Sequence, residues 1–282
     1  MKLIVDSGST KADWIAIDAK GTVLFTTETL GLNPEVLETA EILKRLGDST
    51  DILENKDKVT HLFFYGAGCG TDRMKNYLTE LFQNYFTNAK VVVQEDTYAA
   101  VYATTPKNEK AIVCILGTGS NCTYFDGEVL HQRFQSLGYI AMDDCSGNRF
   151  GRHLIRGYYF KKMPADLATQ FEKDYDLDAD VIKQNLYKEP NPNAYLARFA
   201  QFLIQHKDHP YCKKYIDEEM EAFVTYYIEQ FEDCKEIPVH FIGSIAFYLK
   251  DELTELLSKR GIHIGKVLRR PIDGLIAYHI LN

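Results

Sequence analysis

The sequence lacks any apolar run approaching the roughly 18 residues that a helix needs to span a bilayer. It is also short of positive charge: 32 basic residues stand against 40 acidic ones, and the net charge of −8 opposes the phosphate-neutralising surface that general nucleic-acid binding requires. Its six cysteines form no CxxC pair and no zinc-type cluster with histidine. The first absence excludes a membrane-spanning protein, and the second argues against a nucleic-acid partner. Without such motifs, the cysteines are expected to be small buried thiols in a reducing compartment.

The residues that are present suffice for two domains of ordinary size, since 282 residues at about 150 per domain give nearly two. A composition of 45% hydrophobic and 26% charged residues is typical of a globular chain. The N-terminal sequence reaches the carboxylate of Asp6 after only three apolar residues, which is too soon for the core of a signal peptide. We therefore expect a globular, cytoplasmic protein without a membrane partner.

The first part of the chain alternates strand and helix signals up to a break near residues 106–110. Alternation of polar and apolar residues predicts the strands, and apolar spacing along one face predicts the helices. The expected strands are 3–6, 13–18, 23–29, 61–65 and 90–93, and the expected helices are 35–46, 72–86 and 98–103.

After the break the same order begins again. Strands are expected at 111–116, 121–125 and 128–134, helical periodicity dominates 150–231, and the chain ends with a strand at 239–242, a helix at 245–257, a strand at 263–267 and a helix at 272–281. The turns that follow the first strand of each half begin about 111 residues apart, at Asp6 and Gly117. We expect a duplicated fold with domains 1–106 and 107–282 and a helical insertion at about 146–206. The closing helix packs either on the second half or back on the first.

Two Gly/Ser/Thr turns, one in each half, are the most informative chemical feature. Residues 7–10 read Ser-Gly-Ser-Thr, and residues 117–120 read Gly-Thr-Gly-Ser. Glycine lets the backbone approach a ligand closely, and successive N–H groups with hydroxyls form an anion-binding concavity. Either turn alone is also an ordinary hairpin turn, but their matched positions favour a pair that binds a polyphosphate.

Acidic residues follow several of the expected strands. Asp6 closes the first strand, where it could hold Mg²⁺ through water or cap its own turn. Asp96 follows a buried strand at the edge where open α/β sheets bind ligands, so it is either a general base or the N-cap of a helix that begins at Thr97. Asp143 and Asp144 form a further acidic pair before a helix and could equally act as a cap.

The strand at 239–242 ends in Gly243-Ser244 before a helix. That geometry lets a flat ring or a phosphate approach the backbone, and the simpler alternative is a glycine that packs a strand tightly against a helix.

Together these residues resemble the actin-like ATPase and sugar kinase superfamily, in which two related halves enclose ATP. Residues 6–10 look like the first phosphate motif (DxGxT), residues 116–121 (LGTGSN) like the second, and residues 241–244 (FIGS) like the adenosine motif. The match is most specific to N-acetylglucosamine kinases and the related BadF/BadG type ATPases, and it spans nearly the whole chain. It implies a duplicated α/β fold of the ribonuclease H-like, actin-like ATPase type, with two mixed-sheet domains around a nucleotide cleft.

The resemblance also implies roles for individual residues. Asp6 would organise Mg²⁺ through water, and Asp96 would take the proton from the acceptor hydroxyl. Gly243 and Ser244 would lie against the adenosine. The implied phosphate-binding residues are Ser7, Gly8, Thr10, Gly117, Thr118 and Gly119, and the implied sugar-binding residues are Asn33, Gly138, Asp143 and Asp144.

The chain departs from the family pattern in the sugar-binding loop. The family motif GDEGS corresponds here to residues 142–146, Met-Asp-Asp-Cys-Ser, so both of its glycines are lost, and the aromatic residue expected soon after the sugar asparagine is replaced around Pro34-Glu35. The resemblance therefore supports the phosphate-binding half of the site more fully than the sugar-binding half.

The function implied is an ATP- and Mg²⁺-dependent kinase of an amino sugar, first of all N-acetylglucosamine at its 6-hydroxyl. One alternative is an ATPase that activates an acyl-CoA dehydratase through an Fe–S cluster, for which Cys145 lies near the right loop without a close partner cysteine. The other is a non-catalytic sugar or nucleotide sensor. The identity of the sugar among the hexosamines and the choice between a monomer and a homodimer stay open.

Overall fold

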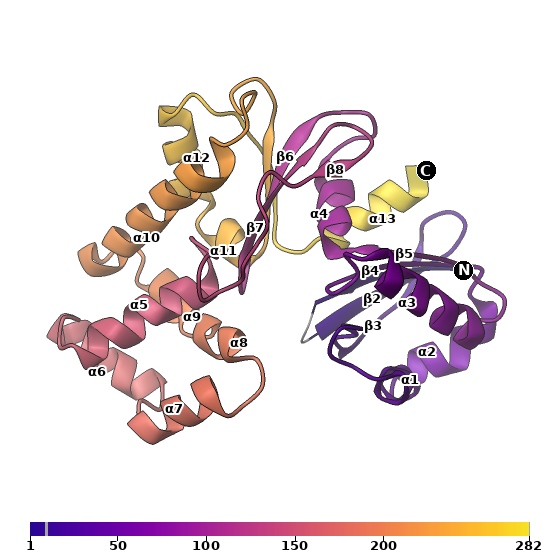
Figure 1. Cartoon of the computed structure of the whole chain (residues 1–282), viewed down its shortest axis with the longest axis horizontal. Helices are drawn as coiled ribbons and strands as arrows, with labels where there is room; N and C mark the ends of the chain where they lie inside the picture. The colour runs from indigo at the N-terminus through magenta and orange to yellow at the C-terminus, as the bar shows by residue number, and fades with distance from the viewer. Residues whose placement is uncertain (9–10, 282) are drawn as a thin grey trace. The chain divides into compact units, whose positions relative to one another are not determined.

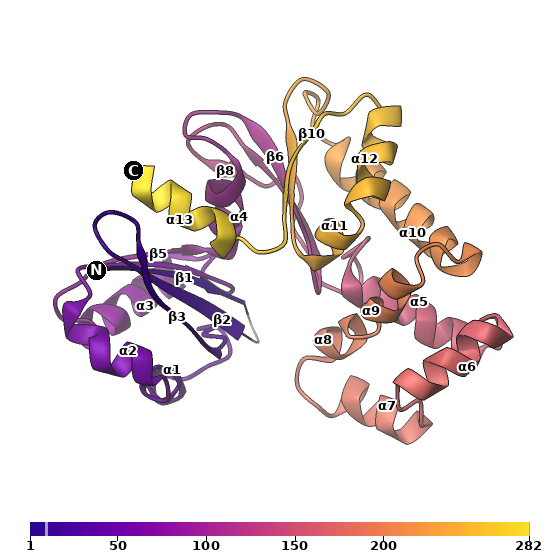
Figure 2. The same ribbon diagram turned by 180° about the vertical axis from the view of Figure 1, so that it is seen from behind.

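The computed structural model describes residues 1–8 and 11–281, which form two compact units. Unit 1 consists of Met1–Lys107 and Arg270–Asn282, and unit 2 of Asn108–Arg269. The break in the sequence pattern near residue 106 coincides with the first change of unit. The C-terminal segment, which the sequence boundary assigns to the second domain, belongs to unit 1, so both ends of the chain lie in that unit (Figures 1 and 2).

Unit 1 is built on a five-stranded mixed sheet with the order β3-β2-β1-β4-β5. The first three strands form antiparallel hairpins, whereas β4 and β5 run parallel to β1. Parallel strands place their carboxyl ends at one edge of the sheet, where ligands collect in open α/β folds. The strands are β1 (Lys2–Ser7), β2 (Lys11–Ile17), β3 (Val23–Leu30), β4 (His61–Gly66) and β5 (Lys90–Glu95).

Helices cover both faces of this sheet (Figures 1 and 2). On one face, fully buried residues such as Trp14 and Phe64 pack against the first three helices. On the other face, α4 and α13 pack together, and the Phe63 ring stacks on His279 at 4.0 Å. The helices are α1 (Thr39–Gly47), α2 (Thr50–Asn55), α3 (Asp72–Tyr85), α4 (Asp96–Thr104) and α13 (Ile272–Leu281).

Unit 2 repeats the same sheet. Its strand order is β10-β9-β6-β7-β8, so β8, β7, β6, β9 and β10 correspond in turn to β3, β2, β1, β4 and β5 of unit 1. As in unit 1, the first three strands, β6, β7 and β8, form antiparallel hairpins, and β9 and β10 extend the sheet in parallel with β6. This correspondence confirms the predicted duplicated α/β fold. The strands are β6 (Ala111–Leu116), β7 (Ser120–Phe125), β8 (Leu130–His131), β9 (Val239–Ile242) and β10 (Ile264–Leu268).

A long helical insertion between β8 and β9 distinguishes unit 2 from unit 1. A single apolar core joins the sheet to these helices through fully buried residues such as Cys114, Phe150 and Phe223. The helices of the insertion are α5 (Gly147–Tyr159), α6 (Ala165–Asp174), α7 (Ala179–Tyr187), α8 (Pro192–Ala197), α9 (Ala200–Gln205) and α10 (Pro210–Phe223), with a π-helical segment at Val224–Ile228. Two further helices, α11 (Ser244–Tyr248) and α12 (Lys250–Lys259), lie between β9 and β10.

Local side-chain bonds explain two expectations that were wrong. The strand expected at 128–134 is reduced to the two residues of β8, because the Asp126 carboxylate accepts from the N–H groups of Glu128 and Val129 and extends the turn. The helix expected from residue 35 begins at Thr39, since the side-chain oxygen of Asn33 accepts from the Glu35 N–H and forms a turn there.

The helix expected at 245–257 is divided into α11 and α12 at Leu249, whose backbone (φ −107°, ψ 26°) is not helical. The strand at 239–242 and the closing helix at 272–281 have the predicted bounds. Among the described residues, no helix has both the length and the apolar character that crossing a membrane requires.

Candidate functional site

Asp6 stands near the carboxyl end of β1, in the centre of the unit 1 sheet. It lies opposite Asp13 on β2 and beside Tyr65 on β4 in the strand register. Burial, followed by the negative charges of Asp96 and Asp13, raises the pKa of Asp6 to about 7, and Arg270 opposes this rise. Asp6 and Asp96 are therefore close enough in space to interact.

Asp96 is the first residue of α4, directly after β5. The alternative role for Asp96 was the N-cap of a helix that begins at Thr97. The N-cap is instead Glu95, one residue earlier, and no side chain caps the helix. Burial first, and then the charge of Glu95, raise the pKa of Asp96 to about 6, while the N–H groups of Thr97 and Asp96 itself lower it. A half-buried carboxylate whose pKa approaches neutrality can exchange a proton near physiological pH.

The loop that follows β4 connects Asn33 with the acidic residues at the end of β5. Gly68 has φ 81°, and a side chain at this position would overlap the amide of Asn33. At Gly70 an added Cβ would lie 3.4 Å from the Glu95 carboxylate. Burial, with the charges of Asp96 and Glu95, raises the pKa of the Cys69 thiol to about 12. The small residues of this loop thus allow Asn33 and Asp96 to lie on the same edge of unit 1.

The first of the two turns predicted to bind phosphate is described only at Ser7 and Gly8. Ser7 is fully buried, and its hydroxyl accepts from the Leu32 N–H at 2.9 Å, so it fixes the segment that carries Asn33. Gly8 is exposed, and its N–H donates to the carbonyl of Lys11 at 2.9 Å. Thr10 lies outside the described residues. Lys11 forms ion pairs with Asp13 and Glu28.

The second turn predicted to bind phosphate, residues 117–119, joins β6 to β7 in unit 2. The Gly117 N–H donates to the carbonyl of Gly119 at 2.9 Å, which closes the turn. The carbonyl of Gly117 accepts from the Gly147 N–H at 2.8 Å. Thr118 is exposed at the tip. In the described part of the chain, no hydrogen bond is recorded from the N–H groups of Thr118 and Gly119, so both are available to an anion.

Gly243 packs directly on this turn. With φ 118°, it takes a conformation open to glycine, and a Cβ there would overlap the carbonyl of Leu116 and lie 3.1 Å from the Gly117 nitrogen. The next residue, Ser244, lines a cavity of about 490 Å³. Ala197, Ile245, Tyr248, Arg198 and Arg269 are among the other residues that line it.

This cavity adjoins the phosphate turn, because a Cβ at Gly147 would lie 3.0 Å from Ala197 and 3.2 Å from the carbonyl of Gly117. Gly243 was expected either to let a ligand approach the backbone or to pack a strand tightly against a helix. The geometry is compatible with both, because Gly243 is closely packed and also brings a cavity next to the turn.

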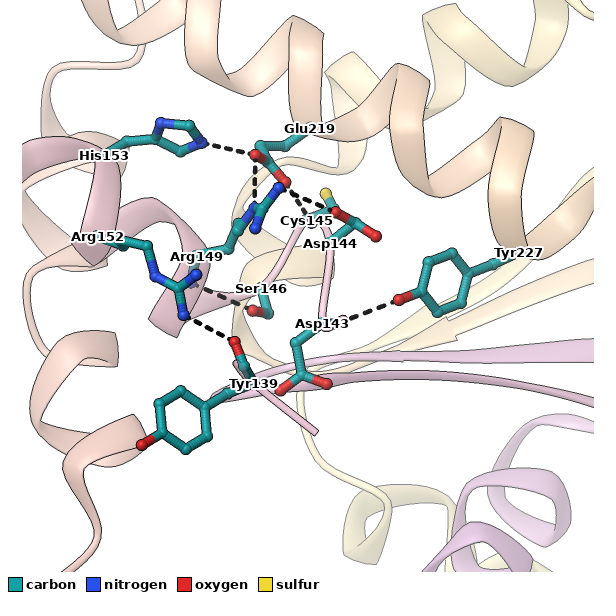
Figure 3. A network of polar contacts seen from close by, with 10 residues as sticks. All are labelled: Tyr139, Asp143, Asp144, Cys145, Ser146, Arg149, Arg152, His153, Glu219 and Tyr227. Atoms are coloured by element: carbon teal, nitrogen blue, oxygen red, sulfur yellow. Dashed lines mark hydrogen bonds and ion pairs between the residues drawn. The ribbon is translucent and has the colours of Figure 1, made fainter. Parts of the chain in front are cut away.

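The acidic loop before α5 is buried and held by hydrogen bonds from several elements (Figure 3). Asp143 is 7% exposed, and its N–H donates to the hydroxyl of Tyr227 at 3.2 Å. Burial raises the pKa of Asp143, while the side chain of Asn148 and the backbone of Ser120 oppose the rise. Asp144 pairs with Arg149 at 3.4 Å. Asp143 is thus a fixed, buried carboxylate, whereas Asp144 already has a cationic partner.

Glu219 on α10 anchors this loop (Figure 3). Its carboxylate accepts from the Cys145 N–H at 3.1 Å, from Arg149 Nε at 3.0 Å and from His153 Nε2 at 2.6 Å. Burial would raise the pKa of Glu219, but these bonds outweigh it and hold the pKa below its usual value. Cys145 occupies the position of a lost motif glycine with φ 58°, and Glu219 provides a charge-assisted bond that holds this left-handed backbone.

Gly138 also has positive φ, at 77°, and its carbonyl accepts from the N–H of Met142 at 2.9 Å. The following residue, Tyr139, is held through its carbonyl by Arg152 at 2.8 Å (Figure 3).

Cys145 is fully buried, which leaves it unable to ligate an Fe–S cluster between subunits.

The sequence analysis missed several residues around Asp6 and Asp96 in unit 1 and around the acidic loop in unit 2. Glu95, Gly68 and Gly70 could have been found from the pattern Gly-Ala-Gly-Cys-Gly at 66–70, a glycine-rich loop directly after a predicted strand. Glu219 and Arg270 gave no such signal, because helices or segments distant in sequence supply them. No group of three or more acidic, His or Cys side chains suited to a metal occurs among the described residues.

Comparison with known proteins relates the chain to solved structures. The protein named "Putative N-acetylglucosamine Kinase" from Porphyromonas gingivalis is 34% identical, with a TM-score of 0.93 over 100% of this chain and 99% of that one. No protein-family model matches the chain, and no curated protein does.

Two more distant structures show the same fold. One, from Chromobacterium violaceum, carries the same name and is 16% identical, with a TM-score of 0.70 over 98% of both chains. The other is a ROK family glucokinase from Streptomyces griseus in complex with glucose and AMPPNP; it is 15% identical, with a TM-score of 0.60 over 99% of this chain and 98% of that one.

Proposed function

The chain belongs to the N-acetylglucosamine kinase-like group of sugar kinases in the actin-like ATPase superfamily, and on that premise we propose that it transfers the γ-phosphate of ATP to the 6-hydroxyl of N-acetylglucosamine. The observation that carries this proposal is Asp96, a half-buried carboxylate at the carboxyl edge of the unit 1 sheet whose pKa is about 6. Such a group is ionised at neutral pH and still basic enough to accept a proton from a hydroxyl.

In the proposed reaction, Asp96 orients the acceptor hydroxyl and removes its proton as the oxygen attacks the γ-phosphate in line. Phosphoryl transfer depends mainly on positioning and on stabilisation of charge, so one base and a well-defined phosphate site suffice. Exclusion of water from the closed site would protect ATP from hydrolysis.

Asp6 would hold Mg²⁺ through coordinated water. The residues around it fit a cation, because the charges of Asp96 and Asp13 together with burial raise its pKa to about 7, and a divalent ion would relieve that repulsion. A single carboxylate is enough for an ion that keeps most of its water. When bound, Mg²⁺ supplies neutralisation of the developing charge on the phosphates.

In unit 2 the turn at 117–119 would bind phosphate oxygens through the N–H groups of Thr118 and Gly119. The adjoining cavity beside Ser244 would hold the adenosine, with Gly243 keeping it close to the turn. In unit 1, Ser7, Gly8 and Thr10 would complete the phosphate contacts.

We assign sugar-binding roles to Asn33 in unit 1 and to Gly138, Asp143 and Asp144 in unit 2. Of these, Asp143 has the strongest structural support, since its carboxylate is buried and its orientation is fixed by hydrogen bonds. Pocket shape on the scale of a few ångströms decides which hexosamine is accepted.

The first test replaces Asp96 with asparagine. Loss of the base should lower kcat by about 10²- to 10⁴-fold with little change in the affinity for ATP. Steady-state kinetics with coupled ADP detection, together with titration of ATP binding, would measure both quantities.

Asp72→Asn is the matched control. It makes the same chemical change in unit 1 at a side chain that is 96% exposed, and it should leave kcat unchanged. An Asp96→Asn enzyme with wild-type turnover would remove Asp96 from the chemistry.

A panel of hexosamines in the same ADP assay tests the choice of acceptor. N-acetylglucosamine should give the highest kcat/KM among N-acetylglucosamine, glucosamine, N-acetylmannosamine and N-acetylmuramic acid, and the product should carry phosphate at the 6-position. Sugar-independent ADP release, or none with any sugar, would favour an ATPase or a sensor instead.

A further inference from the structure

Asn148, at the start of α5, joins the acidic loop to the phosphate turn. Its side-chain Nδ2 donates to the carbonyl of Thr118 at 2.7 Å and to Oδ2 of Asp143 at 3.0 Å. Its backbone N–H also donates to the Thr118 carbonyl, at 3.0 Å. One amide group therefore contacts both the turn assigned to the phosphates and the carboxylate assigned to the sugar.

These bonds set the direction of the turn's peptide groups. In a planar trans peptide the C=O and N–H point in opposite directions, so fixing the Thr118 carbonyl toward α5 turns the N–H of Gly119 away from it. The carbonyl of Gly117, held by the Gly147 N–H, fixes the N–H of Thr118 in the same manner. The two N–H groups without a recorded partner in the described chain are thus oriented by the first turn of α5.

The Asn148 side chain is buried, and only part of its hydrogen-bonding capacity is used. It is 0% exposed, and because its Nδ2 faces two oxygens, the amide cannot be reversed. Its Oδ1 is buried with no hydrogen-bond partner. A buried acceptor left unpaired is unfavourable.

The contact between loop and turn is also tight. A Cβ at Gly119 would lie 2.6 Å from Oδ2 of Asp143, so only glycine leaves room for the carboxylate. A ligand bound to the Asp143 carboxylate would therefore act on the turn by two routes, through Asn148 and through direct contact with the Gly119 backbone.

We infer that Asn148 is a positioning residue that couples the two ligands: sugar bound at Asp143 steadies the Asn148 amide, which orients the Gly119 N–H and tightens nucleotide binding. This inference rests on the proposed function. By reciprocity, bound nucleotide must raise the affinity for the sugar by the same factor.

The test measures the dissociation constant of AMPPNP with Mg²⁺, by calorimetry, in the absence and in the presence of saturating N-acetylglucosamine. The wild type should bind AMPPNP about 10-fold more tightly with the sugar, within the usual range of allosteric coupling. Asn148→Ala should reduce this factor to below about 3-fold, while its affinity for AMPPNP alone changes less than the coupling does.

Asn185→Ala is the matched control, since Asn185 also bonds a backbone carbonyl, that of Val181 at 2.8 Å, but lies on the outside of unit 2. It should keep the wild-type coupling. Asn148→Ser serves as the second variant if Asn148→Ala does not fold, because a hydroxyl can replace one of the two donated bonds but not both.

Two results would overturn the inference: an unchanged coupling factor in a folded Asn148 variant, even if both ligands bind more weakly, or no coupling in a wild type that phosphorylates the sugar. A wild type that releases no ADP with any hexosamine would instead contradict the proposed function.

Discussion

Three aspartates, Asp6, Asp13 and Asp96, interact at one edge of the unit 1 sheet. Because burial and like charges raise the pKa of Asp6 to about 7, the folded protein keeps a proton there that the unfolded chain releases near pH 4. The folded state therefore binds more protons across this range, and the contribution of Asp6 to stability falls as the pH rises from about 4 to about 7. Above that range the carboxylate is ionised at a cost that a bound cation would reduce.

Replacing Asp6 with asparagine should remove this cost. Without divalent cations, the free energy of unfolding of Asp6→Asn relative to the wild type should increase by about 2–3 kcal/mol between pH 5 and pH 8, since one pKa unit corresponds to about 1.4 kcal/mol. Urea titrations followed by the fluorescence of Trp14, which is fully buried in unit 1, would measure it. Added Mg²⁺ at pH 8 should stabilise the wild type and leave the variant unchanged.

Other groups titrate in this window but do not obscure the comparison. Burial lowers the pKa of His240 and His279 to about 4, so their contribution is lost as the pH falls from about 6.5 to about 4, but it is the same in both proteins. Asp72→Asn again provides the control at an exposed position. Stability curves of wild type and Asp6→Asn that run parallel from pH 5 to pH 8 would contradict the assignment.

Single residues were predictable from the sequence where they directly follow a strand. The sequence predicts Asp6 and Asp96 at one edge of the sheet, because the carboxyl ends of parallel strands meet there, and the structure places Asp6 near the end of β1 and Asp96 directly after β5. Their roles in the site stay predictions. Glu219 could not be found, since it reaches the loop from a helix 74 residues after Cys145. The role of Asn148 was equally hidden, because it depends on where the Thr118 carbonyl and the Asp143 carboxylate meet.

At the scale of elements, the close contact of α13 with α4 depends on a glycine. A Cβ at Gly274 would overlap the carbonyl oxygen of Ala103 and lie 2.8 Å from its Cα. These are backbone atoms of α4 that cannot turn aside. Tyr278 and Tyr102 stack at 4.3 Å across the same pair of helices, so a displacement of α13 would also separate these rings.

Gly274→Ala should therefore destabilise the protein by about 1–3 kcal/mol, as overpacking does, although alanine favours a helix by about 1 kcal/mol. Gly47→Ala is the matched control: Gly47 ends α1, nothing lies within 4 Å of its added Cβ, and the substitution should be neutral or stabilising. Thermal and urea unfolding of both variants would decide. Equal effects of the two substitutions would show that close packing at Gly274 does not limit α13.

Element types were predicted better than element bounds. The strand at 239–242 and the helix at 272–281 are punctuated by Gly243 and Pro271, and their bounds were correct. The strand after Asp126 and the helix after Asn33 were expected to be longer, because hydrophobic spacing does not show that a polar side chain bonds the next backbone N–H groups.

At the scale of the whole molecule, the chain folds as two versions of one sheet, and unit 1 draws on both ends of the chain. The helix α13 adds the buried residues Ile272 and Leu275 to a unit that otherwise consists mainly of Met1–Lys107. The single tryptophan of the chain lies in unit 1, whereas most helical residues belong to unit 2. Tryptophan fluorescence and far-UV circular dichroism therefore report mainly on different units.

Deleting residues 270–282 should destabilise unit 1 selectively. Loss of Ile272 and Leu275 alone removes about 3–6 kcal/mol of apolar burial, so the midpoint by Trp14 fluorescence should fall well below the midpoint by circular dichroism. Leu253→Ala, a substitution at a fully buried residue of α12, should do the reverse at a cost of about 2–5 kcal/mol and lower mainly the circular dichroism midpoint. If each change shifted both midpoints equally, the two units would unfold as one cooperative body, and the division at Lys107 and Arg270 would describe the architecture of the chain without describing its stability.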